Sequence, residues 1–270
     1  MPDSTPYRTI AVASTFSPRF VEVLAEAKRI GDRFASDLSL IYVGEKSAET
    51  AAKFRAALEQ LALPANSVIH YEQGDPAEGI LRALLAHKID MIVAGALEKP
   101  LVLHPFLGNV ARRLVREANC SVMLFTHPHT QPKPLRKIVF IADDSPNALE
   151  ALKRTLRLAA AEATERLHVI RLITAFDEAR AKARGEHEKF RAPGRQETAL
   201  EEFVLSAGAT DVPIEARCVR GNTGFAAADF VHSIGADLLV VPVSPSADGK
   251  LPKNIAWLTD VIPCNLWLIR

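Results

Sequence analysis

The feature that most limits the possible folds of this 270-residue chain is an internal repeat. The segment TIAVASTFSP, beginning at Thr9, is matched by KIVFIADDSP, beginning at Lys137. Later in each copy, IDMIVA from Ile89 is matched by ADLLVV from Ala236. Because one chain of this length can hold two domains of ordinary size, the repeat predicts two similar domains in tandem.

The offset between the copies grows from 128 residues (137 minus 9) to 147 residues (236 minus 89). A net insertion therefore lies between these points, and the charged stretch 176–197 is its obvious place. We expect an exposed helix and turn there, which is either a docking segment or a solvated excursion. Residues 127–136 contain several prolines and no apolar period, so they are predicted to form the linker between domains 1–126 and 137–270.

Within the first copy, short apolar runs alternate with amphipathic segments. The runs that predict strands are 7–14, 38–43, 68–71, 91–95 and 120–125. A serine cap and a first-turn proline, Ser17 and Pro18, predict that the first helix begins there. The alternation predicts an α/β fold in each copy, with a Rossmann-like, five-stranded and mainly parallel sheet carrying helices on both faces.

The stretch 90–125 contains the clearest candidate site. Gly95 ends a predicted strand, where the missing Cβ lets a ligand or a helix approach closely. Gly108 and Asn109 open the next helix, and Asn109 can cap it. The free N–H groups of a first helical turn bind anions, so the stretch suits a phosphate group. An ordinary tight connection between strand and helix needs the same glycines, and the residues alone leave both interpretations open.

Composition bears on several classes of partner and on location. The formal net charge is +1, which provides no overall field to attract nucleic acid or a membrane surface. No apolar run approaches the length of a membrane span, and the first residues lack a signal-peptide pattern. The three cysteines lie in or beside predicted strands, which suits a reducing compartment. We therefore expect a cytoplasmic protein that binds neither nucleic acid nor membrane.

No catalytic or metal-binding motif is found in the sequence. Asp143 and Asp144 are adjacent carboxylates, but neighbouring residues at a strand end point in opposite directions, so we do not expect them to share a site. His127 and His129 in the linker have no further ligand fixed nearby. We expect a protein that is not an enzyme and has no metal site of its own.

The stretch 90–125 resembles the universal stress protein family. That family carries G-x2-G-x9-G-[ST]-hydrophobic-Ala before a helix, and this chain has Gly95, Gly108 and Val110-Ala111 at the required spacing. It departs from the pattern at Glu98, where the second glycine belongs, and at Asn109, which replaces serine or threonine. The resemblance covers nearly all of both copies and implies two adenine nucleotide alpha hydrolase-like domains.

In family members that bind ATP, the loop wraps the phosphates and the ribose, and an aspartate after the first strand contacts the adenosine. The resemblance carries these roles to the following residues: Ala13, Thr15, Val43, Gly95, Gly108, Asn109 and Val110 in the first copy, and Asp143 in the second. Each copy lacks part of the pattern, since the first has Thr15 in place of the aspartate. The second has Pro242 in place of Gly95 and Lys253 in place of Gly108.

The implied function is a non-enzymatic stress-response regulator that binds ATP or another adenine nucleotide in its first copy, with magnesium only as a companion of the nucleotide. Two alternatives stay open: a protein-binding scaffold that has lost nucleotide, and a weak ATP hydrolase. The carboxylate of Glu98 and the prolines of the second copy favour the scaffold. Family members pair through their final strand, so segments 120–125 and 264–269 are expected to pair within the chain. A homodimer and an unidentified protein partner are further expectations.

Overall fold

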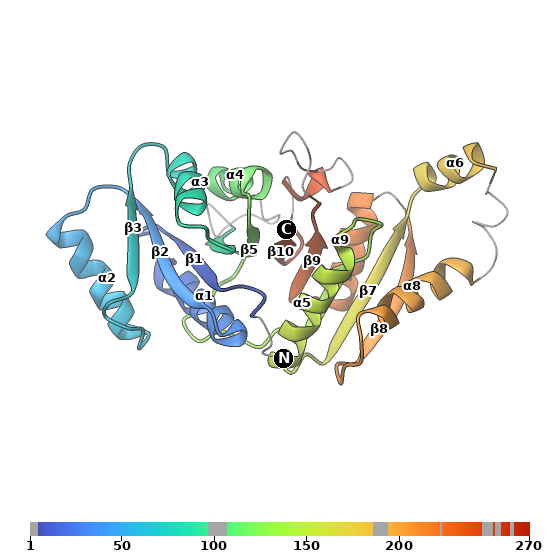
Figure 1. Cartoon of the computed structure of the whole chain (residues 1–270), viewed down its shortest axis with the longest axis horizontal. Coiled ribbons are helices and arrows are strands. Elements are labelled where there is room, and N and C mark those ends of the chain that lie inside the picture. The colour runs from blue at the N-terminus through green and yellow to red at the C-terminus, as the bar shows by residue number, and fades with distance from the viewer. Residues whose placement is uncertain are drawn as a thin grey trace. The chain divides into compact units, whose positions relative to one another are not determined.

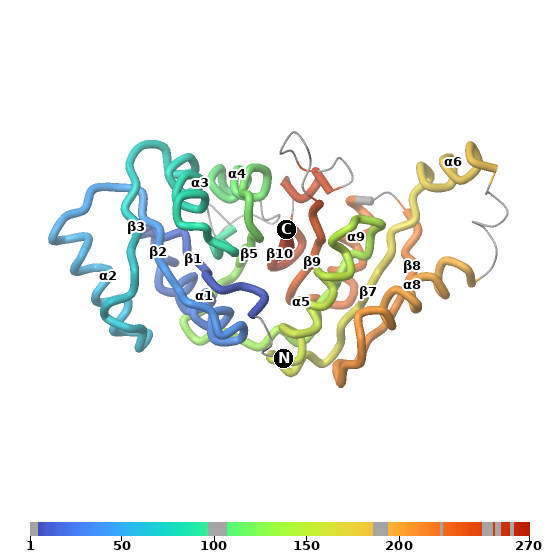
Figure 2. The backbone as a smooth tube through the Cα atoms, viewed as in Figure 1, coloured from blue at the N-terminus to red at the C-terminus, as the bar shows by residue number. Residues whose placement is uncertain are grey.

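The computed structural model describes residues 5–96, 107–185, 194–221, 223–244, 251, 255–259 and 262–270. The chain divides into two compact units, Met1–Lys133 and Pro134–Arg270 (Figures 1 and 2). Each unit is an α/β domain, and each is described below by itself. Among the described residues, no helix is long and apolar enough to cross a membrane.

The first unit contains a parallel five-stranded sheet in the order β3-β2-β1-β4-β5. Its elements are β1 (Thr9–Ser14), α1 (Phe20–Phe34), β2 (Asp37–Val43), α2 (Ala48–Gln60), β3 (Val68–Glu72), α3 (Pro76–Ala86), β4 (Met91–Gly95), α4 (Asn109–Glu117) and β5 (Ser121–Phe125). The chain moves outward from β1 to β3 and then returns to β4 and β5. Right-handed crossovers therefore put α1 and α2 on one face of the sheet and α3 and α4 on the other (Figure 1).

The second unit repeats this plan in the order β8-β7-β6-β9-β10, again with parallel neighbours. Its elements are β6 (Lys137–Ile141), α5 (Ala148–Ala161), β7 (Arg166–Ile173), α6 (Ala175–Ala183), α8 (Arg195–Ser206), β8 (Ile214–Arg220), α9 (Thr223–Ile234), β9 (Leu238–Pro242), the 3-10 helix η1 (Ala256–Thr259) and β10 (Asn265–Ile269). The predicted fold class is confirmed in both copies.

Each unit contains an equivalent hydrogen bond of its own at the amino ends of its strands. Ser36 Oγ donates to the carbonyl of Tyr7 at 2.7 Å, and Thr164 Oγ1 donates to the carbonyl of Leu135 at 2.7 Å. Both hydroxyls follow a helix and reach back to the segment that precedes the first strand of their unit. The same hydroxyl-to-carbonyl hydrogen bond is thus found once in each unit. It holds the segment after the first helix of the unit against the start of its sheet.

A second kind of hydrogen bond, accepted by an aspartate carboxylate, is also found in both units. Asp90 Oδ2 accepts hydrogen bonds from the backbone N–H groups of Arg8 and Thr9 at 2.8 and 2.9 Å. Asp237 Oδ2 accepts one from the N–H group of Lys137 at 2.8 Å. Each aspartate precedes the fourth strand of its unit and orders the start of the first, because charge-assisted hydrogen bonds to backbone N–H groups are among the stronger ones.

An aromatic cluster holds the loop between β1 and α1. The Phe16 ring lies 4.8 Å from that of Phe54 and 5.1 Å from that of Tyr42, measured between ring centroids. Phe54 is fully buried on α2, so the loop is attached to a fixed part of the core. Aromatic pairs at these separations stabilise packing beyond their buried area. The loop that follows β1 is therefore positioned by the domain interior.

The first helix begins later than the sequence pattern predicts. Ser17 and Pro18 precede α1, whose N-cap position is occupied by Arg19 without a side-chain capping bond. The N–H group of Phe20 donates to the carbonyl of Ser17 at 3.0 Å, so residues 17–20 form a turn. The predicted cap at Ser17 is wrong because a serine-proline pair starts a turn as readily as a helix.

One further expectation is corrected. Asn109 is the first residue of α4 and not its cap, since Gly108 occupies the N-cap position.

The charged stretch 176–197 contains most of α6 and the start of α8. Ala181 is buried, and the other residues of α6 are exposed or partly exposed. The described part of the stretch therefore agrees with the expected exposed helix. Residues 186–193 lie outside the described part of the chain.

Candidate functional site

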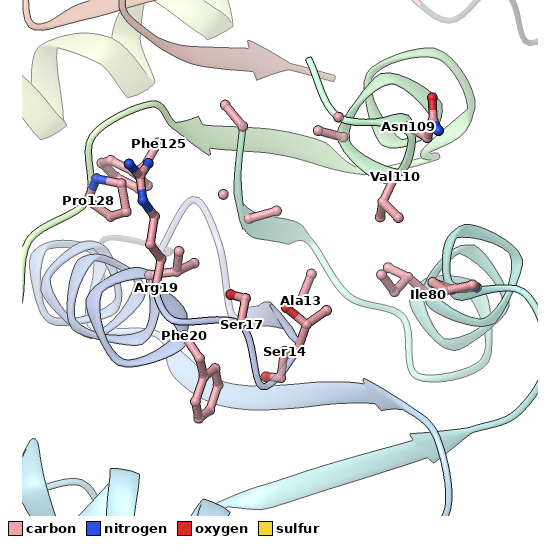
Figure 3. A pocket seen from close by; sticks show the side chains of 18 of the residues that line it. Ala13, Ser14, Ser17, Arg19, Phe20, Ile80, Asn109, Val110, Phe125 and Pro128 are labelled. Atoms are coloured by element: carbon pink, nitrogen blue, oxygen red, sulfur yellow. The ribbon is translucent and has the colours of Figure 1, made fainter. Parts of the chain in front are cut away.

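A cavity of about 440 Å³ lies at the carboxyl ends of the strands in the first unit (Figure 3). The loop after β1, the end of β2, the start of α3, the end of β4, the start of α4 and the end of β5 line it. The strand order reverses between β1 and β4, and the crevice at such a reversal is the usual ligand site of open α/β sheets. The volume is in the range of small-molecule sites.

The structure brings together every candidate residue of the first copy along this cavity. The lining includes Ala13, Thr15, Val43, Gly95, Gly108, Asn109 and Val110. These residues come from four separate stretches of the chain. Asp143 belongs to the second unit and does not line the cavity.

Side chains on one side of the cavity are apolar. Figure 3 shows Val110 of α4 and Ile80 of α3 extending into the space between their helices, near Ala13. Asn109 points away from these residues, so its contribution to the cavity is its backbone. Such a wall suits an aromatic ring system, because it removes apolar ligand surface from water without leaving polar groups unpaired.

Gly95 keeps part of the cavity open. A Cβ built on it would meet only Val23 Cγ2, at 3.4 Å, which is an ordinary contact distance. Neither strain nor a clash with the domain therefore requires glycine here. The space next to Gly95 belongs to the cavity, where a ligand could approach the backbone closely.

Gly79 has a different role. A Cβ on Gly79 would lie 2.8 Å from Val43 Cγ2 and 3.2 Å from Cβ of Glu72. The missing side chain thus lets α3 pack closely on the end of β2. This approach holds Val43 in the cavity wall.

The start of α4 supplies hydrogen-bond donors. Gly108 has φ −61° and ψ 156°, and no side chain of the described residues caps the helix. Within this part of the chain the backbone N–H groups of the first turn are available to water or a ligand, and the helix dipole makes this end positive. Two of the residues in this turn, Asn109 and Val110, line the cavity.

Arg19 is the one charged residue among the described lining residues. Its side chain is half-buried and extends towards Phe125 and Pro128 (Figure 3). Nη1 donates to the carbonyl of Thr126 at 3.2 Å. Sequence reasoning missed Arg19 because the position appeared to lie inside the first turn of a helix.

Other lining residues were also missed. They come from segments that the sequence pattern assigned to the start of a helix, the core or the linker: Ser17, Phe20, Ile80, Phe125 and Pro128. The only usable signal was the position of the predicted strand ends, which does not show which face of α3 or which linker residue would approach. Glu98, Lys99 and His104 lie outside the described residues.

The corresponding region of the second unit is crossed by hydrogen bonds. Asn147 occupies the place of Arg19, and its Nδ2 donates to the carbonyls of Val243 at 2.9 Å and Ile269 at 3.4 Å. Its Oδ1 accepts from Ser244 Oγ at 3.1 Å and lies 3.0 Å from Ser145 Oγ, whose single proton is donated at shorter distance to Asp143. The loop after β6 is thus bonded directly to the ends of β9 and β10.

Asp143 lies in the same loop as Ser145 and Asn147. One of its carboxylate oxygens, Oδ1, accepts from Ser145 Oγ at 2.5 Å and from the Ser145 N–H group at 3.1 Å. Burial raises the pKa of Asp143 above its ordinary value, although the hydrogen bonds from Ser145 oppose this rise. The carboxylate is therefore engaged within its own loop.

The described residues include no group of three or more histidine, cysteine, aspartate or glutamate side chains that could hold a metal ion. In the second unit, η1 is a four-residue 3-10 helix where the first unit has the nine-residue α4. The two units therefore differ at the edge where the cavity lies.

Comparisons with known proteins agree with this architecture. A profile of the universal stress protein family matches residues 6–126 and 134–249. The protein from Thermus aquaticus named "Universal stress protein in QAH/OAS sulfhydrylase 3'region" is 39% identical over 77 residues. That match covers 28% of this chain and 56% of the relative, so the chain spans about half the length of that protein.

Solved structures resemble the whole chain. A protein from Pseudomonas aeruginosa UCBPP-PA14, described as a universal stress protein, superposes with a TM-score of 0.72 at 15% identity, covering 99% of this chain and 95% of that one. A universal stress protein from Archaeoglobus fulgidus DSM 4304 gives a TM-score of 0.68 at 15% identity, covering 97% and 96%. These likenesses concern the fold. Because the family profile matches both halves, the chain belongs to the universal stress protein family and contains two of its domains in tandem.

Proposed function

We propose that the first domain binds an adenine nucleotide in its cavity and that the protein is a non-enzymatic stress-response regulator. The observation that carries the proposal is that residues from four stretches of the chain, chosen from the family pattern, line one cavity. In this arrangement the base lies against the apolar wall that includes Val43 and Ile80. The phosphates lie near Gly95 and the first turn of α4, where backbone N–H groups and the helix dipole favour negative charge.

The proposal that the site binds without turnover rests on the chemistry of the lining. The described lining residues offer the hydroxyl groups of Ser14, Thr15 and Ser17, but no carboxylate, imidazole or thiol that could act as a general base. We place the protein in the cytoplasm, where the free thiols of its cysteines stay reduced.

Calorimetric titration of the full chain with ATP, ADP and AMP tests the binding proposal, with GTP as a control for the base. Saturable binding of the adenine nucleotides supports it, and no heat at millimolar nucleotide contradicts it. Hydrogen exchange in the presence of ATP locates the site. Protection is expected at residues 13–20 and 107–111 and not at residues 141–148.

Phosphate release tests the second part of the proposal. Purified protein incubated with ATP and magnesium should release no more phosphate than the Gly108→Glu variant, whose side chain obstructs the start of α4. Release by the wild type well above that of the variant would favour the ATP hydrolase. The pairing of segments 120–125 and 264–269 stays a prediction. Analytical ultracentrifugation would show whether the chain also forms a homodimer.

A further inference from the structure

The environment of Arg19 leaves most of its hydrogen-bonding capacity unused. A guanidinium group carries five N–H donors. In the described part of the chain, Arg19 makes one hydrogen bond, from Nη1 to the carbonyl of Thr126 at 3.2 Å. No carboxylate among the described residues pairs with it. A half-buried guanidinium with free donors needs water or a ligand to satisfy them.

Arg19 lies at the edge of the cavity. The residue stands at the N-cap of α1 and is one of the lining residues, and its side chain extends along this edge towards Phe125 and Pro128 (Figure 3). In that view, Val110 and the start of α4 lie across the cavity from Arg19. The described lining thus has two positive features, a guanidinium and a helix start, and no negative side chain.

In the second unit, the residue equivalent to Arg19 makes hydrogen bonds within its own domain. Asn147 replaces Arg19 there and uses both polar atoms of its amide within the domain. A neutral amide is sufficient to tie the loop to the ends of β9 and β10. The tie to Thr126 therefore does not require a permanent charge at Arg19.

We propose that Arg19 is a specificity-determining residue of the cavity, whose guanidinium binds an anionic oxygen of the ligand. For an adenine nucleotide this oxygen belongs to a phosphate group. The site consequently selects nucleotides over the neutral nucleoside. This inference rests on the proposed nucleotide site. It specifies in addition that the ligand is anionic and that Arg19 is the residue that recognises its charge.

The test compares Arg19→Gln with Arg55→Gln, an equal change of charge at an exposed position of α2. Calorimetry measures the dissociation constants of ATP, AMP and adenosine for both variants and for the wild type. We expect Arg19→Gln to weaken ATP and AMP by about 10- to 100-fold, as for loss of a hydrogen bond between charged groups. Adenosine affinity should change by less than about threefold, and Arg55→Gln should behave as the wild type.

A second measurement does not depend on the adenine ring. Tripolyphosphate should raise the thermal unfolding temperature of the wild type and of Arg55→Gln more than that of Arg19→Gln. Thermal unfolding without ligand should show that Arg19→Gln is folded, because glutamine retains a side-chain donor for the carbonyl of Thr126.

The outcomes separate the two proposals. If ATP and adenosine lose affinity equally in Arg19→Gln, or neither does, Arg19 does not read the anion although the nucleotide site stands. If the wild type binds no nucleotide but is stabilised by tripolyphosphate through Arg19, the anion site stands and the nucleotide proposal fails. If neither ligand binds, both proposals are overturned.

Discussion

The two domains are alike at the amino ends of their strands and different at the carboxyl ends. At the amino ends, Asp90 and Asp237 each bind the backbone at the start of the first strand. At the carboxyl ends, the first domain has Ala13 and Gly95 beside a cavity. The second domain has larger residues there: Ile141 in place of Ala13 and Pro242 in place of Gly95.

This difference separates what holds the fold from what forms the site. The ties shared by both domains order the strands, and losing them would affect either domain in the same way. The residues at the carboxyl edge differ between the two domains while the strand order is the same, so these residues could change without loss of the fold. We infer that the nucleotide site is a property of the first domain alone.

The largest effect is expected when Ala13 of the first domain is replaced by isoleucine, the residue that the second domain has at this position, and the effect is on ATP affinity. Ala13→Ile places a branched side chain into the cavity, where it overlaps the ligand. An overlap that costs about 3 kcal/mol weakens ATP by about 100-fold. Calorimetric titration of the variant measures the loss.

Ala56→Ile, at an exposed position of α2, is the matched control and should leave affinity unchanged. Stability of Ala13→Ile should stay close to that of the wild type, since the added atoms enter empty space. Unchanged ATP affinity in Ala13→Ile would show that nucleotide binds elsewhere.

The hydrogen bonds of Asn147, which join the loop after β6 to the ends of β9 and β10, lead us to expect an effect of intermediate size on the stability of the second domain. Asn147→Ala removes the side chain that bonds to the carbonyls of Val243 and Ile269. We expect the second domain to lose about 1–3 kcal/mol of its free energy of unfolding, because the buried carbonyl of Val243 loses this donor. The carbonyl of Ile269 keeps a hydrogen bond from the N–H group of Val243 at 2.8 Å. Both tryptophans of the chain, Trp257 and Trp267, lie in this domain, so their fluorescence during urea unfolding reports on it within the intact protein.

Lys153→Ala, on the exposed side of α5, is the control and should change stability by less than about 0.5 kcal/mol. ATP affinity should not change in either variant. A fall in ATP affinity in Asn147→Ala would show that Asn147 of the second domain affects nucleotide binding. It would contradict the inference that the site belongs to the first domain alone.

The smallest effect concerns the pH dependence of the second domain. Burial raises the folded-state pKa of Asp143 above its ordinary value of 3.8, so ionisation costs more in the folded protein than in the unfolded chain. The stability contribution of the protonated group is complete below pH 3.8 and is lost as pH rises through the raised value. We expect the unfolding free energy of the wild type minus that of Asp143→Asn to fall over this interval and then level off.

Lys153→Ala, on the exposed side of α5, is again the control, because it changes no carboxylate. The wild type minus Lys153→Ala should show no such fall. A difference that rises with pH for Asp143→Asn would mean that the hydrogen bonds from Ser145 outweigh burial.

Much of the fold could be predicted from the sequence because buried parallel strands leave continuous apolar runs. Val93 and Leu124 belong to such runs, and both strands are found where the pattern puts them. The start of α1 could not be predicted, because Ser17 and Pro18 favour a turn and a helix alike. That error hid Arg19, whose place at the cavity depends on where the turn ends.

The candidate site was only partly visible for a related reason. Gly95 and Gly108 follow a spacing in the sequence, so the family pattern could identify them. Ile80 and Pro128 approach the cavity through the packing of α3 and the path of the chain after β5, which no local pattern records. The 3-10 helix η1 was likewise hidden, since its residues match those of α4 in the alignment of the copies.

The stoichiometry of ATP binding to the full chain tests the central claim most directly. Calorimetry at protein concentrations above the dissociation constant measures it without any variant. We predict one site per chain, located in the first domain. Two sites per chain would show that the second domain has kept a working cavity behind Asn147, and none would show that the first domain has lost its own.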